Sequence, residues 1–319
     1  MPDQVRHDQY RLLSRQVNML KKGNKMNKIL LGILFSLSIL LGCTSGNTFV
    51  KHDVAISNDS ERIAYNVYGT GKTSLIFIHG WSCDSRYWKN QASVFSKDYQ
   101  VITIDLAGHG NSSSNRNDYT MLSFAKDIKA VIDREKISRA ILIGHSMGGA
   151  VIAETSQLMP KQIISIIGID TFQNVDEKLP QKALDEMIEP FENNFVNAMQ
   201  SFILSMFPEE TDKELINWIK EDMSSAPKNI ALSAFRNYTG QYVNHKAGQV
   251  FESITIPVVS INARLWPTNP EDNRKHIKNY KLFYIEETGH FPMMEKPEEF
   301  NKLLKKALEY IKAENNKDI

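Results

Sequence analysis

Short apolar runs alternate with amphipathic segments along most of the chain after residue 50. Apolar runs of about four to eight residues that are bounded by turn residues predict buried strands. Apolar residues at every third or fourth position predict helices that cover a sheet. Strands are expected near residues 50–56, 61–68, 74–78, 100–105, 140–145, 163–169, 257–262 and 281–285, and helices over 120–135 and 297–313. The first two strands should pair antiparallel, and the later alternation of strands and helices predicts a mostly parallel sheet with helices on both faces.

The long segment between the sixth and seventh predicted strands has only helical patterns. Helices are expected over residues 180–206, 211–223 and 228–246, with breaks at Pro190, Pro208 and Pro227. The large apolar side chains of the segment are Met187, Ile188, Phe191, Phe195, Met199, Phe202, Ile203, Met206, Phe207, Trp218 and Phe235. Most of them should pack the segment against itself, and some should line an apolar pocket that excludes water. We interpret this segment as a helical cap inserted after strand six.

One predicted strand ends in a short turn with a serine at its centre. The sequence Gly144-His145-Ser146-Met147-Gly148 follows the apolar run 140–143 and precedes a helical stretch of small residues. A serine on such an elbow projects its hydroxyl from the top of the sheet, and glycines permit the close backbone crossing. Ser146 is therefore the candidate nucleophile. The simpler interpretation is a serine in a glycine-rich turn.

A candidate base lies near the other end of the chain. Gly289-His290-Phe291-Pro292 follows the predicted strand 281–285 and precedes a helix. A triad on this kind of elbow runs in the order serine, acid, histidine along the chain. His290 is the only histidine after Ser146 on a predicted strand-to-helix loop, so we predict that it is the base.

A third strand end supplies candidate donors for an oxyanion. The buried run 74–78 leads directly into His79-Gly80-Trp81. Acyl transfer places negative charge on the carbonyl oxygen, and two backbone N–H groups can stabilise that charge. We expect these to be the N–H of Trp81 and the N–H of Met147, the residue after the nucleophile.

The order and spacing of four segments resemble the α/β-hydrolase superfamily over residues 50–315. The segments are His79-Gly80-Trp81, the turn Asp105-Leu106-Ala107-Gly108-His109-Gly110-Asn111-Ser112, the serine elbow, and Gly289-His290-Phe291-Pro292. The resemblance implies an α/β fold of the α/β-hydrolase type, with an eight-stranded mostly parallel sheet, helices on both faces and a helical cap after strand six. It also makes Asp105 and His109 structural residues.

The acid departs from the commonest pattern of this superfamily. Most similar members have an aspartate after the seventh strand, whereas here no carboxylate follows until Glu271 and Asp272. In some haloalkane dehalogenases the acid instead ends the sixth strand, where this chain has Asp170. The 24 residues from Ser146 to Asp170 leave room for one helix and one strand, so Asp170 can reach the histidine. We predict Asp170 as the acid, with Glu271 or Asp272, or no acid, as alternatives.

The front of the chain resembles a bacterial lipoprotein signal peptide. Met26-Asn27-Lys28 precede the apolar run 29–42, which ends in Gly42-Cys43. This run of 14 residues is shorter than the roughly 20 that a membrane helix needs. The resemblance implies cleavage before Cys43 and acylation of its thiol, which would anchor the protein at a membrane, facing the extracytoplasmic side of a bacterial cell envelope. The alternative is a cytosolic protein with an anchoring helix.

Charge and cysteine content narrow the possible partners. The chain holds 38 Lys and Arg against 37 Asp and Glu, and loss of residues 1–42 would bring the net charge to −4. This balance gives no indication of nucleic-acid binding. With Cys43 acylated, Cys83 is the only other thiol, so no intramolecular disulfide can form, and we expect Cys83 to be buried. No metal-ligand spacing or phosphate-binding loop occurs, so neither a metal nor a cofactor is predicted.

The predicted organisation has five parts. They are an untranslated or disordered extension over residues 1–25, a signal peptide over 26–42, the first part of the hydrolase core over 43–170, the cap over 171–255 and the second part of the core over 256–319. The predicted function is a lipid-anchored serine hydrolase that cleaves an ester or related acyl bond of a small to medium apolar substrate. A carbon–carbon bond hydrolase or a peptidase could use the same triad, and a hydrolase-like protein that binds a ligand without turnover is the alternative from another class. The oligomeric state is not predicted.

Overall fold

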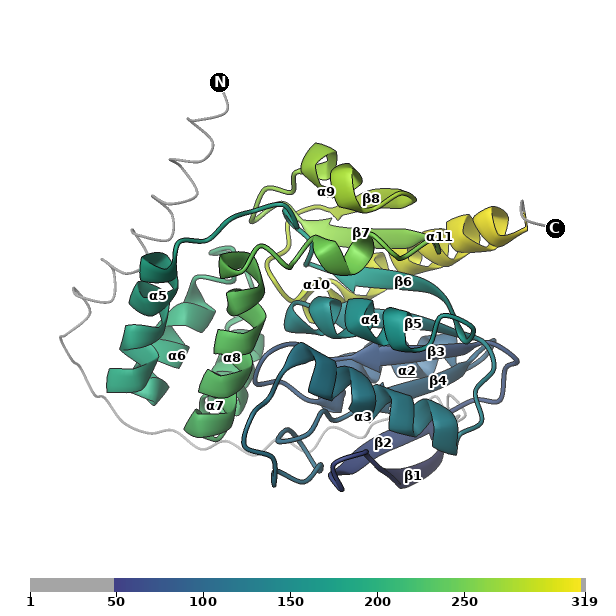
Figure 1. The fold of residues 1–319 in the computed structure, drawn as a ribbon, viewed down its shortest axis with the longest axis horizontal. Coiled ribbons are helices and arrows are strands. Elements are labelled where there is room, and N and C mark those ends of the chain that lie inside the picture. The colour runs from purple at the N-terminus through teal and green to yellow at the C-terminus, as the bar shows by residue number, and fades with distance from the viewer. Residues whose placement is uncertain (1–48, 317–319) are drawn as a thin grey trace, which may run out of the picture. The chain divides into compact units, whose positions relative to one another are not determined.

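The computed structural model describes residues 49–316, and an eight-stranded sheet lies at its centre (Figure 1). The strands are β1 (Phe49–Ile56), β2 (Arg62–Tyr68), β3 (Ser74–Ile78), β4 (Gln100–Ile104), β5 (Ala140–His145), β6 (Ile163–Ile169), β7 (Val258–Ala263) and β8 (Tyr280–Ile285). Their order across the sheet is β1-β2-β4-β3-β5-β6-β7-β8. β1 pairs antiparallel with β2 and β2 antiparallel with β4, while every later pairing is parallel. The predicted fold class is confirmed.

The central strands are covered on both faces. All residues of β3, β5 and β7 are buried, which explains why β3 and β5 are mostly apolar runs rather than alternating ones. Helices α3 (Met121–Arg134) and α4 (Met147–Leu158) pack together on one face, and α2 (Lys89–Phe95) and α11 (Pro297–Asn315) cover the other (Figure 1). The shorter elements are η1 (Ser85–Trp88), η2 (Gln249–Phe251), α9 (Pro270–His276) and α10 (Pro292–Glu295).

The segment between β6 and β7, all of which the structure describes, has no strand, and besides η2 it contains four α-helices. They are α5 (Gln181–Asn193), α6 (Phe195–Leu204), α7 (Lys213–Ser224) and α8 (Lys228–Val243), and Figure 1 shows them grouped to one side of the sheet. The break predicted at Pro190 is wrong, because this proline lies inside α5. The helix ends instead at Asn194, whose extended backbone stops α5 and whose side chain accepts a hydrogen bond from the N–H of Asn197 to begin α6.

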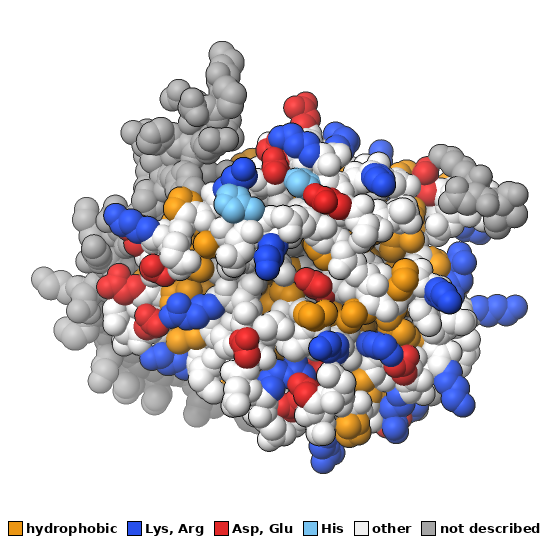
Figure 2. Space-filling view, viewed as in Figure 1, with side chains coloured by type: hydrophobic (Ala, Val, Ile, Leu, Met, Phe, Trp, Pro, Cys, Tyr) orange, Lys and Arg blue, Asp and Glu red, His pale blue; other side chains and the backbone are white. Residues whose placement is uncertain are grey.

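The surface of the described part carries mixed charge. Basic and acidic side chains are interspersed over the face shown in Figure 2. Among the described helices, none is both long and apolar enough to cross a membrane. The extension, the signal peptide and Cys43 lie outside the described residues.

Candidate active site

Ser146 lies between β5 and α4 in a strained backbone conformation. Its φ of 52° and ψ of −120° are rare for a residue with a side chain, and its N–H donates to the carbonyl of Ile169 at 3.0 Å. The two glycines of the elbow are sterically required. A Cβ at Gly144 would lie 2.3 Å from the carbonyl oxygen of Gly148, and one at Gly148 would lie 2.7 Å from that of His79. The sequence thus folds into the tight turn that its glycines predicted.

The sheet register brings Ser146 and Asp170 to one edge. In the parallel pair β5–β6, His145 lies opposite Ile169, so Ser146 and Asp170 leave neighbouring strands side by side. Asp170 also has a positive φ, of 44°. It is anchored by its own N–H, which donates to the carbonyl of Ile261 at 2.9 Å. Both side chains therefore start from the carboxyl ends of the central strands, where α/β proteins place their sites.

Asp170 and His290 are joined by a short hydrogen bond. Asp170 Oδ2 lies 2.6 Å from Nδ1 of His290, and Asp170 Oδ1 accepts the N–H of Ala263 at 2.9 Å. Both side chains are buried, with 0% of the Asp170 side chain and 7% of the His290 side chain exposed. The carboxylate thus uses one oxygen to fix its own position and the other to orient the imidazole ring.

Burial also sets the protonation of this pair. It lowers the pKa of the His290 imidazole below its ordinary 6.5, so the ring is neutral at pH 7. Burial raises the pKa of the Asp170 carboxyl, and the hydrogen bond from the Ala263 N–H opposes that rise. With Nδ1–H donated to Asp170, Nε2 is the nitrogen of His290 that can accept a proton.

The main chain of His290 is held from two sides. The N–H of His290 donates to the carbonyl of Met206 in the segment between α6 and α7, at 2.8 Å. Its carbonyl accepts the Nε2–H of His145 at 2.7 Å. A Cβ at Gly289 would lie 2.2 Å from the Met206 carbonyl oxygen, so only glycine fits beside this contact. Neither His145 nor Met206 is predicted from the sequence as a contact of the base, although His145 lies inside the serine elbow itself.

Two backbone N–H groups lie beside Ser146 with no acceptor among the described residues. They are those of Trp81 and Met147, the first residue of α4, whose N–H has no partner within its helix. The Trp81 loop approaches Ser146 closely, since a Cβ at Gly80 would lie 3.3 Å from the Ser146 Cβ. His79 braces this loop by accepting the N–H of Leu106 at Nε2 and donating from Nδ1 to the Gly80 carbonyl.

The Trp81 side chain joins this loop to the helices between β6 and β7. Its Nε1–H donates to the carbonyl of Ala231 in α8 at 2.8 Å. Its ring lies 4.6 Å from that of Phe235 and 5.4 Å from that of Phe191, measured between centroids. Phe202 completes the cluster at 6.0 Å from Trp81. The wall beside the candidate oxyanion donors is therefore apolar and aromatic.

The alternative acids lie elsewhere. Asp272, in the first turn of α9, accepts hydrogen bonds from Asn174 and Asn269 and pairs with Lys275 at 2.6 Å. Glu271 is exposed on the same helix. The structure thus brings Asp170, and neither Glu271 nor Asp272, to His290.

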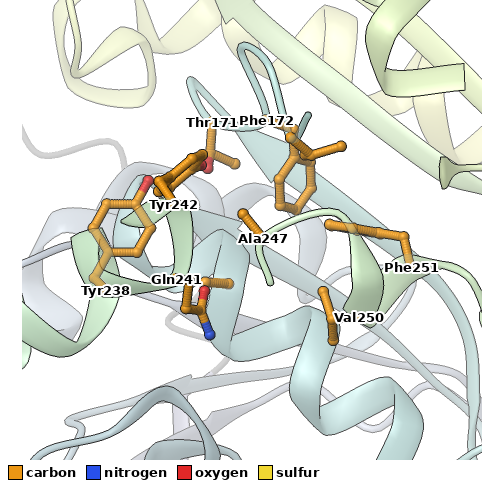
Figure 3. Close-up of a pocket in the computed structure, with 10 residues that line it drawn as sticks. Thr171, Phe172, Tyr238, Gln241, Tyr242, Ala247, Val250 and Phe251 are labelled. Carbon is orange, nitrogen blue, oxygen red and sulfur yellow. The ribbon is translucent and has the colours of Figure 1, made fainter. Parts of the chain in front are cut away.

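Figure 3 shows a small pocket whose lining residues do not include Ser146. Thr171, the residue after Asp170, lines it together with Phe172, Tyr238 and Tyr242. In Figure 3, Tyr242 of α8 lies beside Thr171, so α8 and the residue that follows the acid line the pocket together. Within residues 49–316, no group of three or more His, Cys, Asp or Glu side chains is placed to hold a metal ion.

Comparisons of the sequence and of the structure with known proteins indicate the same protein family. Residues 73–297 match the family described as alpha/beta hydrolase fold. A "Putative esterase/lipase" of Haemophilus influenzae is 27% identical over 238 residues, which cover 73% of this chain and 82% of that protein. The solved structure of "Est816 as an N-Acyl homoserine lactone degrading enzyme" is 26% identical with a TM-score of 0.68, over 80% of this chain and 99% of that one. A thermophilic esterase from Thermogutta terrifontis is 20% identical with a TM-score of 0.70, over 82% and 99% of the two chains. This chain belongs to the alpha/beta hydrolase fold family.

Proposed function

We propose that this protein is a carboxylic-ester hydrolase that forms an acyl-enzyme on Ser146. The observation that carries the proposal is the 2.6 Å bond between Asp170 and His290, at the same sheet edge as the strained Ser146. An ordered Asp–His pair beside a serine elbow is the arrangement that activates a hydroxyl for attack on a carbonyl. The similarity to an esterase/lipase of Haemophilus influenzae supports an ester as the substrate.

In the first half of the reaction, Ser146 Oγ attacks the ester carbonyl and its proton passes to Nε2 of His290. Asp170 keeps the Nδ1–H of His290 in place and stabilises the imidazolium that forms. The N–H groups of Trp81 and Met147 donate to the oxyanion. His290 then protonates the leaving alkoxide. In the second half, water attacks the acyl group on Ser146 with the same base, which releases the acid and restores the serine.

The aromatic cluster around Trp81 supports an apolar substrate. Trp81, Phe191 and Phe235 are buried, and Phe202 is half-buried against them. Their rings form a surface next to the oxyanion donors that favours acyl or alkyl chains and disfavours charged groups. We therefore propose a small to medium apolar acyl group as the part of the substrate that lies beneath the cap.

Anchoring at a membrane is a second part of the proposal, and it is supported by the sequence around Cys43. An acylated cysteine at the mature amino terminus would hold the enzyme on the extracytoplasmic side of a bacterial membrane. The test is incorporation of an alkyne-tagged fatty acid into the full chain in bacterial cells. We expect label and membrane association for the wild type and loss of both for Cys43→Ser. Equal labelling of the variant would exclude this anchor.

The activity is tested with p-nitrophenyl esters of increasing acyl length. Wild type should hydrolyse them with an optimum at short to medium chains, Ser146→Ala should lose turnover, and Ser93→Ala, an exposed serine on α2, should keep it. The competing function is ligand binding without turnover, and the sequence feature that favours it is the lack of an aspartate directly after β7. No serine-dependent hydrolysis of any ester in the series would support that function and contradict the proposal.

A further inference from the structure

We propose that Glu295 is a positioning residue for the base, a role that rests on the proposed function of His290. Glu295 is the last residue of α10, and its carboxylate turns back to the loop that carries His290. Oε2 accepts the N–H of Gly289 at 2.8 Å, and Oε1 accepts the N–H of Phe291 at 3.0 Å. One carboxylate thus binds the peptide groups on both sides of the histidine.

These two N–H groups need an acceptor that the local backbone does not supply. Gly289 and Phe291 are buried, and an N–H group left unpaired in such a place destabilises the folded protein. Hydrogen bonds to a carboxylate are also stronger than those between neutral groups. Because the bonds flank His290, they fix the direction in which its side chain leaves the backbone.

Glu295 also links the base to the cap. Its Oε2 accepts a third hydrogen bond, at 3.1 Å, from the hydroxyl of Thr211 in the segment between α6 and α7. The same segment supplies the Met206 carbonyl that accepts the His290 N–H. The rings of Phe207 and Phe291 stack beside these contacts at 5.4 Å. Residues 206–211 of the cap therefore contact the histidine loop and α10 at three points. Of these three contacts, the hydrogen bond between Thr211 and Glu295 is the one that involves a charged side chain.

The expected consequence is a loss of kcat with little change in KM. The contacts of Glu295 are to loop amides and Thr211, so its removal leaves the aromatic wall intact and shifts the His290 ring relative to Ser146 and Asp170. A misplacement of about 1 Å can cost roughly 100-fold in rate. A residue with only a structural role would instead lower the melting temperature and the fraction of active enzyme, with an unchanged kcat per active site.

The test compares Glu295→Gln with Glu287→Gln in the full chain. The control removes the carboxylate of Glu287, near the same loop, whose side chain is 85% exposed and within residues 49–316 forms one ion pair, with Lys296. Kinetics on p-nitrophenyl acetate, corrected for active sites by titration, should show kcat about 10- to 100-fold lower for Glu295→Gln with KM within about twofold. Glu287→Gln should match wild type. An unchanged kcat per active site in Glu295→Gln would overturn the proposal.

Two additions keep the test decisive. If Glu295→Gln does not fold, Thr211→Val removes only the hydroxyl donor and should lower kcat by a few-fold, while Thr211→Ser should keep the wild-type kcat. An unchanged kcat in Thr211→Val would count against the proposal.

The second additional measurement is proton NMR of the His290 Nδ1–H, which is bonded to Asp170. This resonance should shift in Glu295→Gln and stay in place in Glu287→Gln. This resonance can be measured without turnover. If the protein hydrolyses no ester, the proposed function is refuted, and the shift of the resonance still tests the positioning role of Glu295.

Discussion

Two residues with side chains adopt left-handed backbones at the ends of neighbouring strands. Ser146 and Asp170 have φ values of 52° and 44°, a conformation that costs roughly 1–3 kcal/mol at each position. Both are held there by N–H bonds to the next strand, to the carbonyls of Ile169 and Ile261 respectively. The strain lets both side chains project from the sheet edge instead of into the core.

At the scale of single residues, the assignment of Asp170 as the acid is tested by substitution. Asp170→Asn keeps the shape of the side chain but removes the charge that orients Nδ1–H of His290, so kcat should fall by roughly 1,000- to 10,000-fold. Asp272→Asn changes the same atoms in α9 and should leave kcat unchanged. Steady-state kinetics of both variants on one ester show which of the two carboxylates is the acid. A large loss in the second variant with none in the first would reassign the acid.

The pH dependence follows from the lowered pKa of His290. Only the neutral ring accepts a proton from Ser146, so kcat/KM falls as the pH drops through the pKa of this histidine. Because burial lowers that pKa, the midpoint of the acid limb should lie below pH 6.5. A pH–rate profile of kcat/KM measures it directly. A midpoint above pH 6.5 would contradict the assigned environment.

The sequence identified the groups that stand in motifs and missed those that act across long distances. Ser146 and His290 were found because glycines and strand ends surround them, and Asp170 because it ends an apolar run. Met206 and Glu295 gave no such signal. Met206 contacts His290 through a backbone carbonyl, which any residue could supply, and the bond between Thr211 and Glu295 joins positions 84 residues apart. The catalytic roles themselves stay predictions.

Among the elements, length and burial decided what the sequence could predict. All eight strands were predicted within a few residues, since each is either a mostly apolar run or, like β2, an alternation of buried and less buried positions. The short helices α2 and α10 were not predicted, because a helix of one or two turns carries little periodic signal. A proline within a helical pattern predicts a break at Pro190, but its fixed φ suits a helix, and α5 ends only three residues later.

Helix α3 offers a test of stability at the scale of elements. Asp127 of this helix has no exposed side-chain surface and forms a two-bond pair with Arg116, at 3.0 and 2.6 Å. Arg116→Met would leave that carboxylate buried and unpaired, so the free energy of unfolding should fall by about 3–5 kcal/mol. Lys129→Met removes an exposed pair with Asp133 on the same helix and should cost less than about 1 kcal/mol. Urea unfolding measures both, and equal effects would contradict the ranking.

At the scale of the whole described molecule, η1 and α7 form a second contact between core and cap. The Tyr87 hydroxyl donates to Asp222 Oδ2 at 2.9 Å, and Arg86 pairs with the same carboxylate. The ring of Trp218 lies 5.0 Å from that of Tyr87. Together with the contacts of Trp81 and of residues 206–211, this contact holds the cap against the edge of the sheet where Ser146 lies.

Cys83 reports whether this closed arrangement persists in solution. Its side chain is buried beside Tyr87, and burial raises the pKa of its thiol well above the ordinary value. In the folded protein at pH 8, Ellman's reagent should modify Cys83 at least about 100-fold more slowly than a free thiol, and unfolding should release it. The Cys83→Ser variant measures how much of the labelling comes from Cys43. Labelling of native Cys83 at the rate of a free thiol would show that the cap does not stay closed.

The central claim, that Ser146 is an activated nucleophile, is tested most directly by a fluorophosphonate. The reagent phosphonylates only a serine whose hydroxyl is deprotonated by a neighbouring base, so it reads activation without knowledge of the substrate. Mass spectrometry of the digested protein should show one adduct, on the peptide that contains Ser146. The adduct should be absent in Ser146→Ala and form far more slowly in His290→Ala. An unlabelled wild type, or an adduct that persists in Ser146→Ala, would contradict the account.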